Sequence, residues 1–367
     1  MKIIFLTVHR KDRSPSQRFR FEQYLAFLSE KNFEVTHFYL VSEKDDKLLY
    51  SKGNLIKKAL LLLKYVLRLI KLCRGISSYD ICFVQREVIF LWTFYFEKII
   101  SKKTNLVYDF DDSIFLPNIS ENNKNFSFLK GYKKIKKIIE ISDLIFAGNS
   151  YLEKYALKHN KNVKVVPTTI DTDIYSEVSL PKSEFVTIGW SGSVTTIKHF
   201  EYAVPFLKII KEKYGDAISI KVIGDKDYIN KDLDIIGLPW VKETELIDLS
   251  SIDIGIMPLP DDKWSKGKCG LKGLQYMSLG IPTLMSPVGV NNEIIEDGVN
   301  GFLCNHIDEW VDRISQLIES SELRNKIGAN GKHSVETKYS VNVWKHKYLN
   351  YFESLLNEKN SIIQKTY

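Results

Sequence analysis

Two patterns of hydrophobic and polar positions alternate along the chain. Short apolar runs, such as KIIFLTV at 2–8 and DICFVQ at 80–85, are followed by longer stretches in which apolar residues recur every three or four positions. The first pattern is typical of buried parallel strands, and the second is typical of helices that cover a sheet with one face. The alternation therefore predicts an α/β protein built from βαβ units.

The pattern places elements in both halves of the chain. In the first half, strands are expected at 2–8, 34–40, 80–85, 105–110, 144–148 and 163–167, with helices at 15–31, 54–73, 128–141 and 149–158. In the second half, strands are expected at 185–192, 218–224, 238–241, 252–258, 282–286 and 301–304. Helices are expected there at 197–213, 243–250, 270–279, 290–296, 307–319, 321–336 and 341–358.

A polar stretch without periodicity separates the two sets of elements. A chain of 367 residues is long for a single core, so we expect two domains. We predict a first domain at 1–170, a linker at 171–184 and a second domain at 185–340, with helix 341–358 packing back on the first domain. Two doubly wound, Rossmann-like parallel-sheet domains would face each other across a ligand cleft at the carboxyl ends of their strands.

Composition and charge narrow the functional classes. A net charge of +7 favours anionic partners, and no nucleic-acid-binding module accompanies it, so we expect small anions or a membrane surface rather than nucleic acid. The start MKIIFLTV is typical of a strand rather than of a secretion signal, and no apolar stretch has the length of a membrane span. The cysteines lie far apart, which argues against a zinc site or a disulfide framework: Cys73, Cys82, Cys269 and Cys304. We therefore expect a cytoplasmic protein, with the inner face of the membrane as a possible location.

The segment 266–289, KGKCGLKGLQYMSLGIPTLMSPVG, carries the most specific chemistry. Its glycines and lysines lie where a short helix begins, and a helix N-terminus with nearby cations suits a phosphate. Helical spacing places Lys272 and Gln275 away from the apolar face that Leu274 and Met277 form. The alternative is an ordinary turn with solvated lysines.

Residues 267–282, GKCGLKGLQYMSLGIP, resemble the donor-site motif of the retaining glycosyltransferases of family 4, which have the GT-B fold. Cys269, Gly270 and Leu271 match the motif residues whose backbone amides hold the nucleotide diphosphate. Gly267 replaces the first glutamate of the motif, and Gln275 replaces the glutamate that grips the ribose. An amide still bonds ribose hydroxyls, without the assistance of a charge.

Other segments extend the resemblance over most of 185–335. In GWSGSVTTIKHF, Gly192 and Lys198 match a family element, while Ser193 stands at the position of its arginine. The resemblance implies that Lys198 neutralises the diphosphate and that Lys268 or Lys272 replaces the missing cation. It also implies base contacts near Trp240 and Val241. It further implies a nucleotide diphosphate sugar as donor, retention at the anomeric carbon, no cofactor and no obligatory metal.

Two segments of the first half are candidates for the acceptor side. Ser14-Pro15-Ser16-Gln17 has the pattern of a capping box at the start of a helix. A helical wheel places Arg18 beside the apolar face at the cleft mouth and Arg20 on the opposite face. Arg18 is therefore either a ligand contact, which we favour, or half of a buried ion pair.

The stretch YDFDDSIFLP leaves a strand with three carboxylates that repel one another unless they meet cations, hydroxyls or water. Asp112, and after it Asp111, is our candidate for a sugar or acceptor contact, and the alternative is an aspartate that caps the next segment. Gln85, Arg86 and Glu87 end a strand at the same level and are expected to line the acceptor side. No catalytic base is named, because transferases of this kind are thought to use the leaving phosphate.

Basic helices raise the possibility of a membrane surface. In 55–75 the residues Lys57, Lys64, Arg68 and Lys71 recur on one stripe, and 130–140 is a second basic helix. Such helices bind anionic membranes or carry a solvated stripe.

The motif resemblance and these basic helices together predict a family-4-like glycosyltransferase of cell-surface polysaccharide or glycolipid synthesis, with a glycan or lipid-linked acceptor. The alternatives are a GT-B nucleotide-sugar epimerase and a non-catalytic subunit that binds sugar nucleotides.

Overall fold

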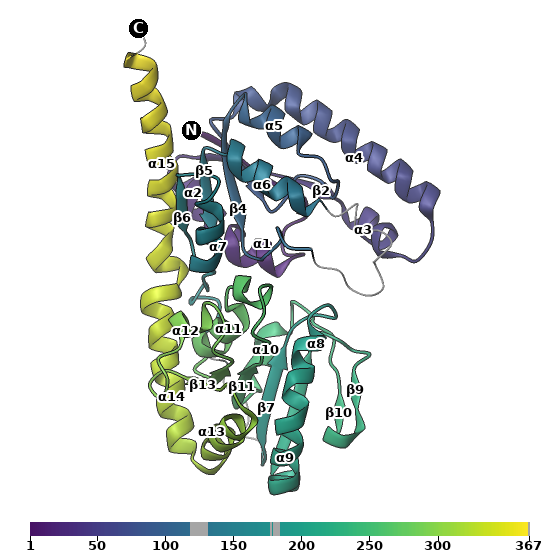
Figure 1. Ribbon diagram of the computed structural model, residues 1–367, viewed down its shortest axis with the longest axis vertical. Helices are drawn as coiled ribbons and strands as arrows, with labels where there is room; N and C mark the ends of the chain where they lie inside the picture. The colour runs from purple at the N-terminus through teal and green to yellow at the C-terminus, as the bar shows by residue number, and fades with distance from the viewer. Residues whose placement is uncertain (118–130, 177, 179–183, 366–367) are drawn as a thin grey trace. The chain divides into compact units, whose positions relative to one another are not determined.

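The computed structural model describes residues 1–117, 131–176, 178 and 184–365 (Figure 1). The chain divides into two compact units. The first comprises Met1–Pro167 with Lys345–Tyr367, and the second comprises Thr168–Trp344. The helix α15, Val341–Lys365, begins in the second unit and continues in the first.

The first unit is built on a six-stranded parallel sheet with the order β2-β1-β3-β4-β5-β6. Its strands are β1 (Lys2–His9), β2 (Glu34–Val41), β3 (Ile81–Gln85), β4 (Asn105–Phe110), β5 (Leu144–Ala147) and β6 (Val163–Val165). Its central strands β3 and β4 are buried along their whole length, which explains why they read as continuous apolar runs. The predicted strands of this half are confirmed.

Helices cover this sheet: α1 (Pro15–Arg20), α2 (Leu25–Glu30), α3 (Glu43–Tyr50), α4 (Leu55–Gly75), α5 (Tyr95–Ser101), α6 (Tyr132–Ile141) and α7 (Ser150–Ala156). Figure 1 shows α5 between α4 and α6. The part of α15 that belongs to this unit packs aromatic rings on its core: Tyr348 stacks on Tyr24 with ring centroids 4.4 Å apart. Phe352 packs against Phe83, which anchors the helix to the sheet.

The second unit has a five-stranded parallel sheet with the order β13-β12-β11-β7-β8. Its strands are β7 (Val186–Ser191), β8 (Ile218–Ile223), β11 (Ile254–Met257), β12 (Thr283–Met285) and β13 (Phe302–Leu303). Its α-helices are α8 (Ile197–Phe200), α9 (Val204–Tyr214), α10 (Glu245–Ser250), α11 (Leu271–Ser278), α12 (Asn291–Ile294), α13 (Ile307–Glu319) and α14 (Ser321–Ser334). Phe206 of α9 stacks on Trp310 of α13 with ring centroids 4.6 Å apart, which joins two helices of this core.

Several local expectations are wrong. The stretch 15–31 forms two short helices joined by a 3₁₀ turn, Glu22–Tyr24, rather than one helix. Residues 238–241 form no strand, and a small hairpin of β9 (Ile229–Asn230) and β10 (Ile235–Ile236) precedes them. Helices α3 and α5 are additions, and the first residues of the expected helix 128–141 lie outside the described residues.

The segment expected as a linker begins within the second unit. Ile170, which directly precedes this segment, is fully buried, and its backbone N–H donates to the carbonyl of Tyr339 at 2.9 Å. Tyr175 is buried as well. Residues 177 and 179–183 of the expected linker lie outside the described residues. Polar composition concealed this docking, because the contacts that order the segment come from residues far away in the sequence.

Candidate functional site

The start of α11 requires glycine. Gly270 precedes the helix with a φ of +69°, in the left-handed region that L side chains rarely adopt. A Cβ at this position would lie 2.2 Å from the Cδ1 atom of Ile294, so the Ile294 side chain would have to shift to admit one. Cys269 is buried, Leu271 is half-buried, and the flanking Lys268 and Lys272 reach the surface in part. The helix start is thus held in place by packing on its inner side.

A tyrosine hydroxyl ties α11 to the end of β7. The Tyr276 hydroxyl accepts a hydrogen bond from the Ser191 backbone N–H at 2.6 Å and donates to the Ser191 hydroxyl at 3.1 Å. The loop after β7 begins with Gly192, where a Cβ would lie 2.1 Å from the Trp190 ring. Ser193 follows on the surface. The two glycine-bearing segments that the sequence singled out therefore lie together.

Three lysines gather around a buried histidine. Burial lowers the pKa of His199 to about 3, and three nearby lysine charges lower it as well. These are Lys272, Lys268 and Lys198, in decreasing order of effect. His199 is 4% exposed, and its Nδ1 atom has no hydrogen-bond partner in the described part of the chain. The lysines predicted to meet a diphosphate thus share one neighbourhood, where they create a positive potential.

Aromatic faces hold two of these lysines in place. The Lys272 Nζ atom lies 4.8 Å from the centroid of the buried Trp190 ring. The Lys268 Nζ atom lies 5.7 Å from the centroid of the Trp264 ring. Cation–π contacts of this length restrict the ammonium groups while leaving them charged. Lys198 is exposed at the side of α8.

Gln275 belongs to a buried polar cluster that the sequence reading did not anticipate. Glu245, the first residue of α10, accepts hydrogen bonds from the Tyr175 hydroxyl at 2.7 Å and from the Trp240 Nε1 atom at 2.9 Å. It also accepts from the Gln275 Nε2 atom at 3.3 Å. Glu245 and Gln275 are only 7% and 5% exposed. Glu245 thus brings a carboxylate next to the Gln275 amide.

The cluster fixes the orientation of the Gln275 amide. A carboxylate accepts and does not donate, so the NH₂ end of Gln275 must face Glu245. The Tyr175 oxygen, 3.4 Å away, lies on the same side. Within the described residues the Gln275 amide oxygen has no hydrogen-bond partner, so one acceptor of this side chain is unused by the cluster.

Tyr175 and Glu245 carry weak sequence signals. Tyr175 lies in the polar stretch expected as a linker, and Glu245 is one of several charged residues in KETEL. Trp240 is half-buried through its bond to Glu245, whereas Val241 is 39% exposed. Only the fold brings residues so far apart in the sequence to one carboxylate.

A buried ion pair in the first unit corrects one expectation. Arg20 and Asp109 form an ion pair, with side chains 0% and 1% exposed, and Arg20 also donates to the carbonyl of Val166. Burial raises the pKa of Asp109, while the Arg20 charge acts in the opposite direction. Arg20, expected on the outer face, is thus the buried arginine, because α1 ends at this residue and the wheel does not continue. Arg18 is half-buried, with its guanidinium 5.1 Å from the Phe19 ring centroid.

The other two carboxylates meet the partners that their repulsion requires. The Arg86 Nε atom lies 2.7 Å from an Asp111 carboxylate oxygen, and an Arg86 Nη atom lies 3.6 Å from Asp112. The Ser16 hydroxyl donates to Asp111 at 2.6 Å. Burial alone would raise the pKa of Asp111, but the Arg86 charge outweighs it and the pKa is lowered. Asp112 is buried and accepts from the Ser113 backbone N–H at 3.2 Å.

The strand-end residues complete this network. The Gln85 amide donates to the Ser16 hydroxyl at 2.5 Å, so this serine belongs to the polar network. The predicted capping box is wrong, since the Ser14 side chain makes no cap hydrogen bond and Gln17 bonds the backbone of His9.

Arg86 has a φ of +61°, and its carbonyl accepts from the Tyr108 hydroxyl at 2.7 Å. Glu87 forms an ion pair with Lys134 at 2.7 Å.

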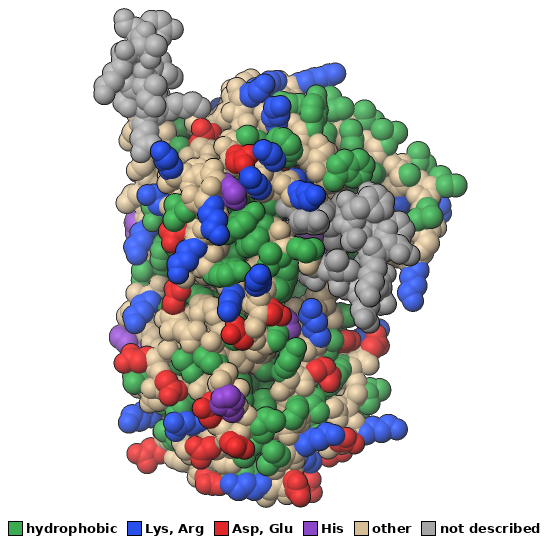
Figure 2. Space-filling view, viewed as in Figure 1, with side chains coloured by type: hydrophobic (Ala, Val, Ile, Leu, Met, Phe, Trp, Pro, Cys, Tyr) green, Lys and Arg blue, Asp and Glu red, His purple; other side chains and the backbone are tan. Residues whose placement is uncertain are grey.

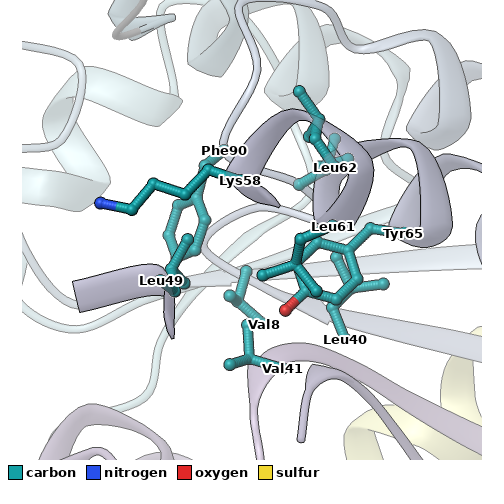
Figure 3. Close-up of a pocket in the computed structure, with 10 residues that line it drawn as sticks. Val8, Leu40, Val41, Leu49, Lys58, Leu61, Leu62, Tyr65 and Phe90 are labelled. Atoms are coloured by element: carbon teal, nitrogen blue, oxygen red, sulfur yellow. The ribbon is translucent and has the colours of Figure 1, made fainter. Parts of the chain in front are cut away.

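An apolar pocket of about 150 Å³ lies at the carboxyl ends of strands β1 and β2 of the first sheet (Figure 3). Val8 and Val41, near the ends of β1 and β2, form part of its wall, and Tyr65 of α4 closes another side. Lys58 brings the single charged group to the lining, and Phe90 is 45% exposed. The remaining lining residues are Leu40, Leu49, Leu61, Leu62 and Ile89. The pocket suits a small hydrocarbon group.

The described ranges of the chain, 1–117, 131–176, 178 and 184–365, lack two kinds of feature. They hold no group of three or more histidine, cysteine, aspartate or glutamate residues that is arranged to bind a metal ion. They also hold no helix with the length and apolar character needed to cross a bilayer.

Two Rossmann-like parallel-sheet units of this kind define the GT-B class of glycosyltransferase folds, which confirms the predicted fold class. Residues 186–320 match the family model described as glycosyl transferases group 1. The match covers β7 to α13 and so includes the lysines, α11 and, of the Glu245 cluster, all members except Tyr175.

Curated proteins match the chain over part of its length. The chain is 25% identical over 244 residues to the N-acetyl-alpha-D-glucosaminyl L-malate synthase of Bacillus anthracis, covering 61% of this chain and 63% of that protein. The chain spans less than two thirds of the length of the curated relatives it matches.

Solved structures match over nearly the whole chain. Sucrose-phosphate synthase from Thermosynechococcus elongatus superposes with a TM-score of 0.71 at 13% identity, covering 97% of this chain and 99% of that one. Anabaena HepE in complex with UDP and glucose superposes with a TM-score of 0.68 at 15% identity, covering 96% and 100%. At these identities the likeness concerns the fold.

Proposed function

We propose that the protein transfers a sugar from a nucleotide diphosphate sugar to an acceptor hydroxyl, with retention, as family-4-like enzymes do. The observation that carries the proposal is the arrangement along α11. Three lysines gather around His199, two of them at the start of α11, and the Gln275 amide oxygen, which has no partner within the described residues, lies one turn further along. One turn is about 5.4 Å, a spacing that suits a ribose and the phosphates attached to it.

The donor contacts divide between charge and hydrogen bonding. The diphosphate is held by the start of α11 at Cys269 to Leu271 together with the three lysines. The Gln275 amide oxygen accepts from a ribose hydroxyl, since its NH₂ end is committed to Glu245. The base lies near Trp240 and Val241, and Gly192 with Ser193 lines the diphosphate side. Anabaena HepE, which shares the fold, is bound to UDP-glucose in one structure, which supports a donor of this class.

The chemistry follows from where charge develops. As the glycosidic bond to the donor breaks, the leaving diphosphate gains negative charge, and fixed lysines stabilise that charge more than they stabilise the ground state. The leaving phosphate takes the proton of the acceptor hydroxyl, so no side chain is assigned as base.

The first unit supplies the acceptor side in this proposal. Asp112 and Asp111 contact the sugar or the acceptor, Arg86 and Gln85 belong to the network around them, and Arg18 and Glu87 are assigned to the same side. The apolar pocket at the carboxyl ends of β1 and β2 favours an acceptor that carries a hydrocarbon group, such as a lipid-linked glycan. With such an acceptor, the proposed reaction belongs to the synthesis of a cell-surface polysaccharide or glycolipid at the cytoplasmic face of a membrane.

Calorimetric titration with UDP and with inorganic pyrophosphate tests the donor site. Gln275→Ala should weaken UDP binding and leave pyrophosphate binding almost unchanged, because only UDP carries the ribose. Asn292→Ala, which removes an exposed amide from α12, serves as the matched control and should change neither affinity. Equal losses for both ligands in Gln275→Ala would contradict the ribose contact, and no binding of either ligand to the unchanged protein would refute this assignment of the donor site.

A non-catalytic subunit would give the same binding result, so turnover is measured separately. Release of UDP from UDP-sugars in the presence of lipid-linked acceptors supports transfer. Binding without release across a panel of nucleotide sugars and acceptors favours the non-catalytic alternative.

A further inference from the structure

Helix α4 has an apolar face on each of two opposite sides. Leu61, Tyr65, Leu69 and Cys73 are its buried residues and pack into the first unit. On the opposite side five large apolar side chains reach solvent: Ile56, Leu60, Leu63, Leu67 and Ile70, with exposed fractions of 80%, 61%, 54%, 57% and 37%. We call these five residues the outer row.

The outer row is continuous. Its members are spaced by four, three, four and three residues, so they fall on one line along a straight helix and extend about 21 Å. A single exposed leucine is ordinary, but a contiguous apolar surface of this kind marks an interaction site. Figure 2 shows hydrophobic side chains over the surface that α4 forms, with basic side chains beside them.

Basic residues define one edge of the row. Helix α4 contains no acidic residue, and Lys57, Lys64 and Lys71 follow one another every seven positions along that edge. Lys57 and Lys71 are exposed and make no ion pair with the described part of the chain. Lys64 pairs with Asp45 at 2.8 Å, and Arg68 donates to the carbonyl of Leu40 at 2.7 Å. Part of the basic stripe is therefore used within the unit, and the apolar row is the larger exposed feature.

We propose that α4 lies in the plane of an anionic lipid membrane, with the outer row in the acyl boundary and Lys57 and Lys71 at the headgroups. This arrangement is that of interfacial amphipathic helices, whose binding combines buried apolar area with attraction to anionic lipids. Charge decides against a second copy of the chain, because facing two outer rows would bring two acid-free, basic helices together. The inference gives a location to the lipid-linked acceptor proposed above, but it rests on α4 alone.

Sedimentation of the full chain with vesicles tests the inference. We expect binding to vesicles of equimolar phosphatidylcholine and phosphatidylglycerol and weaker binding to phosphatidylcholine alone. The double variant Leu63→Asn with Leu67→Asn should lower the partition coefficient at least about tenfold, at low and at high salt, since each leucine contributes burial worth about a factor of ten. Lys57→Gln with Lys71→Gln should cause a smaller loss that disappears at high salt.

A matched variant controls for exposed apolar residues in general. Ile229→Asn with Ile236→Asn alters two side chains of the second unit that are 65% and 76% exposed, and it should bind vesicles like the unchanged protein. The proposal is overturned if the leucine variant binds vesicles normally. It is also overturned if light scattering shows that the unchanged protein is a dimer and that, of these variants, only the leucine variant is a monomer. Nucleotide binding, measured on the same samples, should be unaltered, so that failure here is separable from failure of the donor site.

Discussion

Two polar regions, one in each unit, differ in how their charges are balanced. In the first unit the carboxylates at the end of β4 are matched by cations within the unit: Asp109 by Arg20, and Asp111 and Asp112 by Arg86. In the second unit three lysines lower the pKa of one histidine, and the Gln275 amide oxygen lacks a partner in the described residues. A cluster of like charges beside an acceptor without a partner in the described residues has capacity for a ligand, whereas buried ion pairs also contribute to the stability of their unit.

The largest effect is expected when the buried ion pair between Arg20 and Asp109 is broken. Arg20→Met leaves the Asp109 carboxylate buried without its cation, and this should lower the free energy of unfolding by about 3–5 kcal/mol. Denaturant unfolding measures the loss. The double variant Arg20→Met with Asp109→Leu should recover most of the stability, because no buried charge then remains unpaired. Arg18→Met is the control and should cost less than about 1 kcal/mol. A loss as large in Arg18→Met would mean that Arg20 has no special role.

A smaller change in free energy is expected for UDP binding when one lysine near His199 is removed. Lys198→Ala should weaken UDP binding by about 1.5–3 kcal/mol while leaving the free energy of unfolding nearly unchanged, since Lys198 is exposed. Calorimetry at moderate salt measures the affinity. Lys226→Ala, an exposed lysine in the loop after β8, should change it little. If the two variants bind UDP equally well, Lys198 does not contact the diphosphate.

The smallest effect concerns pH. The pKa of His199 is lowered to about 3, so this histidine is neutral when folded and takes up a proton on unfolding below about pH 6.5. The unfolded state then binds more protons, and stability falls as the pH falls from about 6.5 toward 4. Between about pH 7 and pH 5 this loss amounts to at most about 2 kcal/mol for one histidine.

His199→Gln isolates that term. Urea unfolding of the variant should show a shallower pH dependence than the unchanged protein, with His9 and His37, both lowered to a pKa of about 4, still contributing. A pH dependence identical in both proteins would show that folding does not lower the pKa of His199.

The sequence by itself determined the class of architecture. Parallel strands buried on both faces must read as apolar runs, and the helices between them must show one apolar face, so the βαβ order and nearly all strands of both sheets followed from periodicity. The sequence also marked the glycine before α11, and the φ of +69° at Gly270 explains why a glycine stands there.

Tertiary structure decided which polar residues share a neighbourhood. Periodicity placed Arg18 inward and Arg20 outward, but α1 ends at Arg20, which then turns to Asp109 in the core. Nothing near Glu245 in the sequence announces that Tyr175 and Gln275 donate to it from 70 and 30 positions away. The same holds for α4, whose leucines suggest a buried helix until the fold leaves the outer row uncovered. Periodicity follows from each element's own backbone geometry, whereas ion pairs, shared hydrogen bonds and exposed faces depend on where distant elements pack.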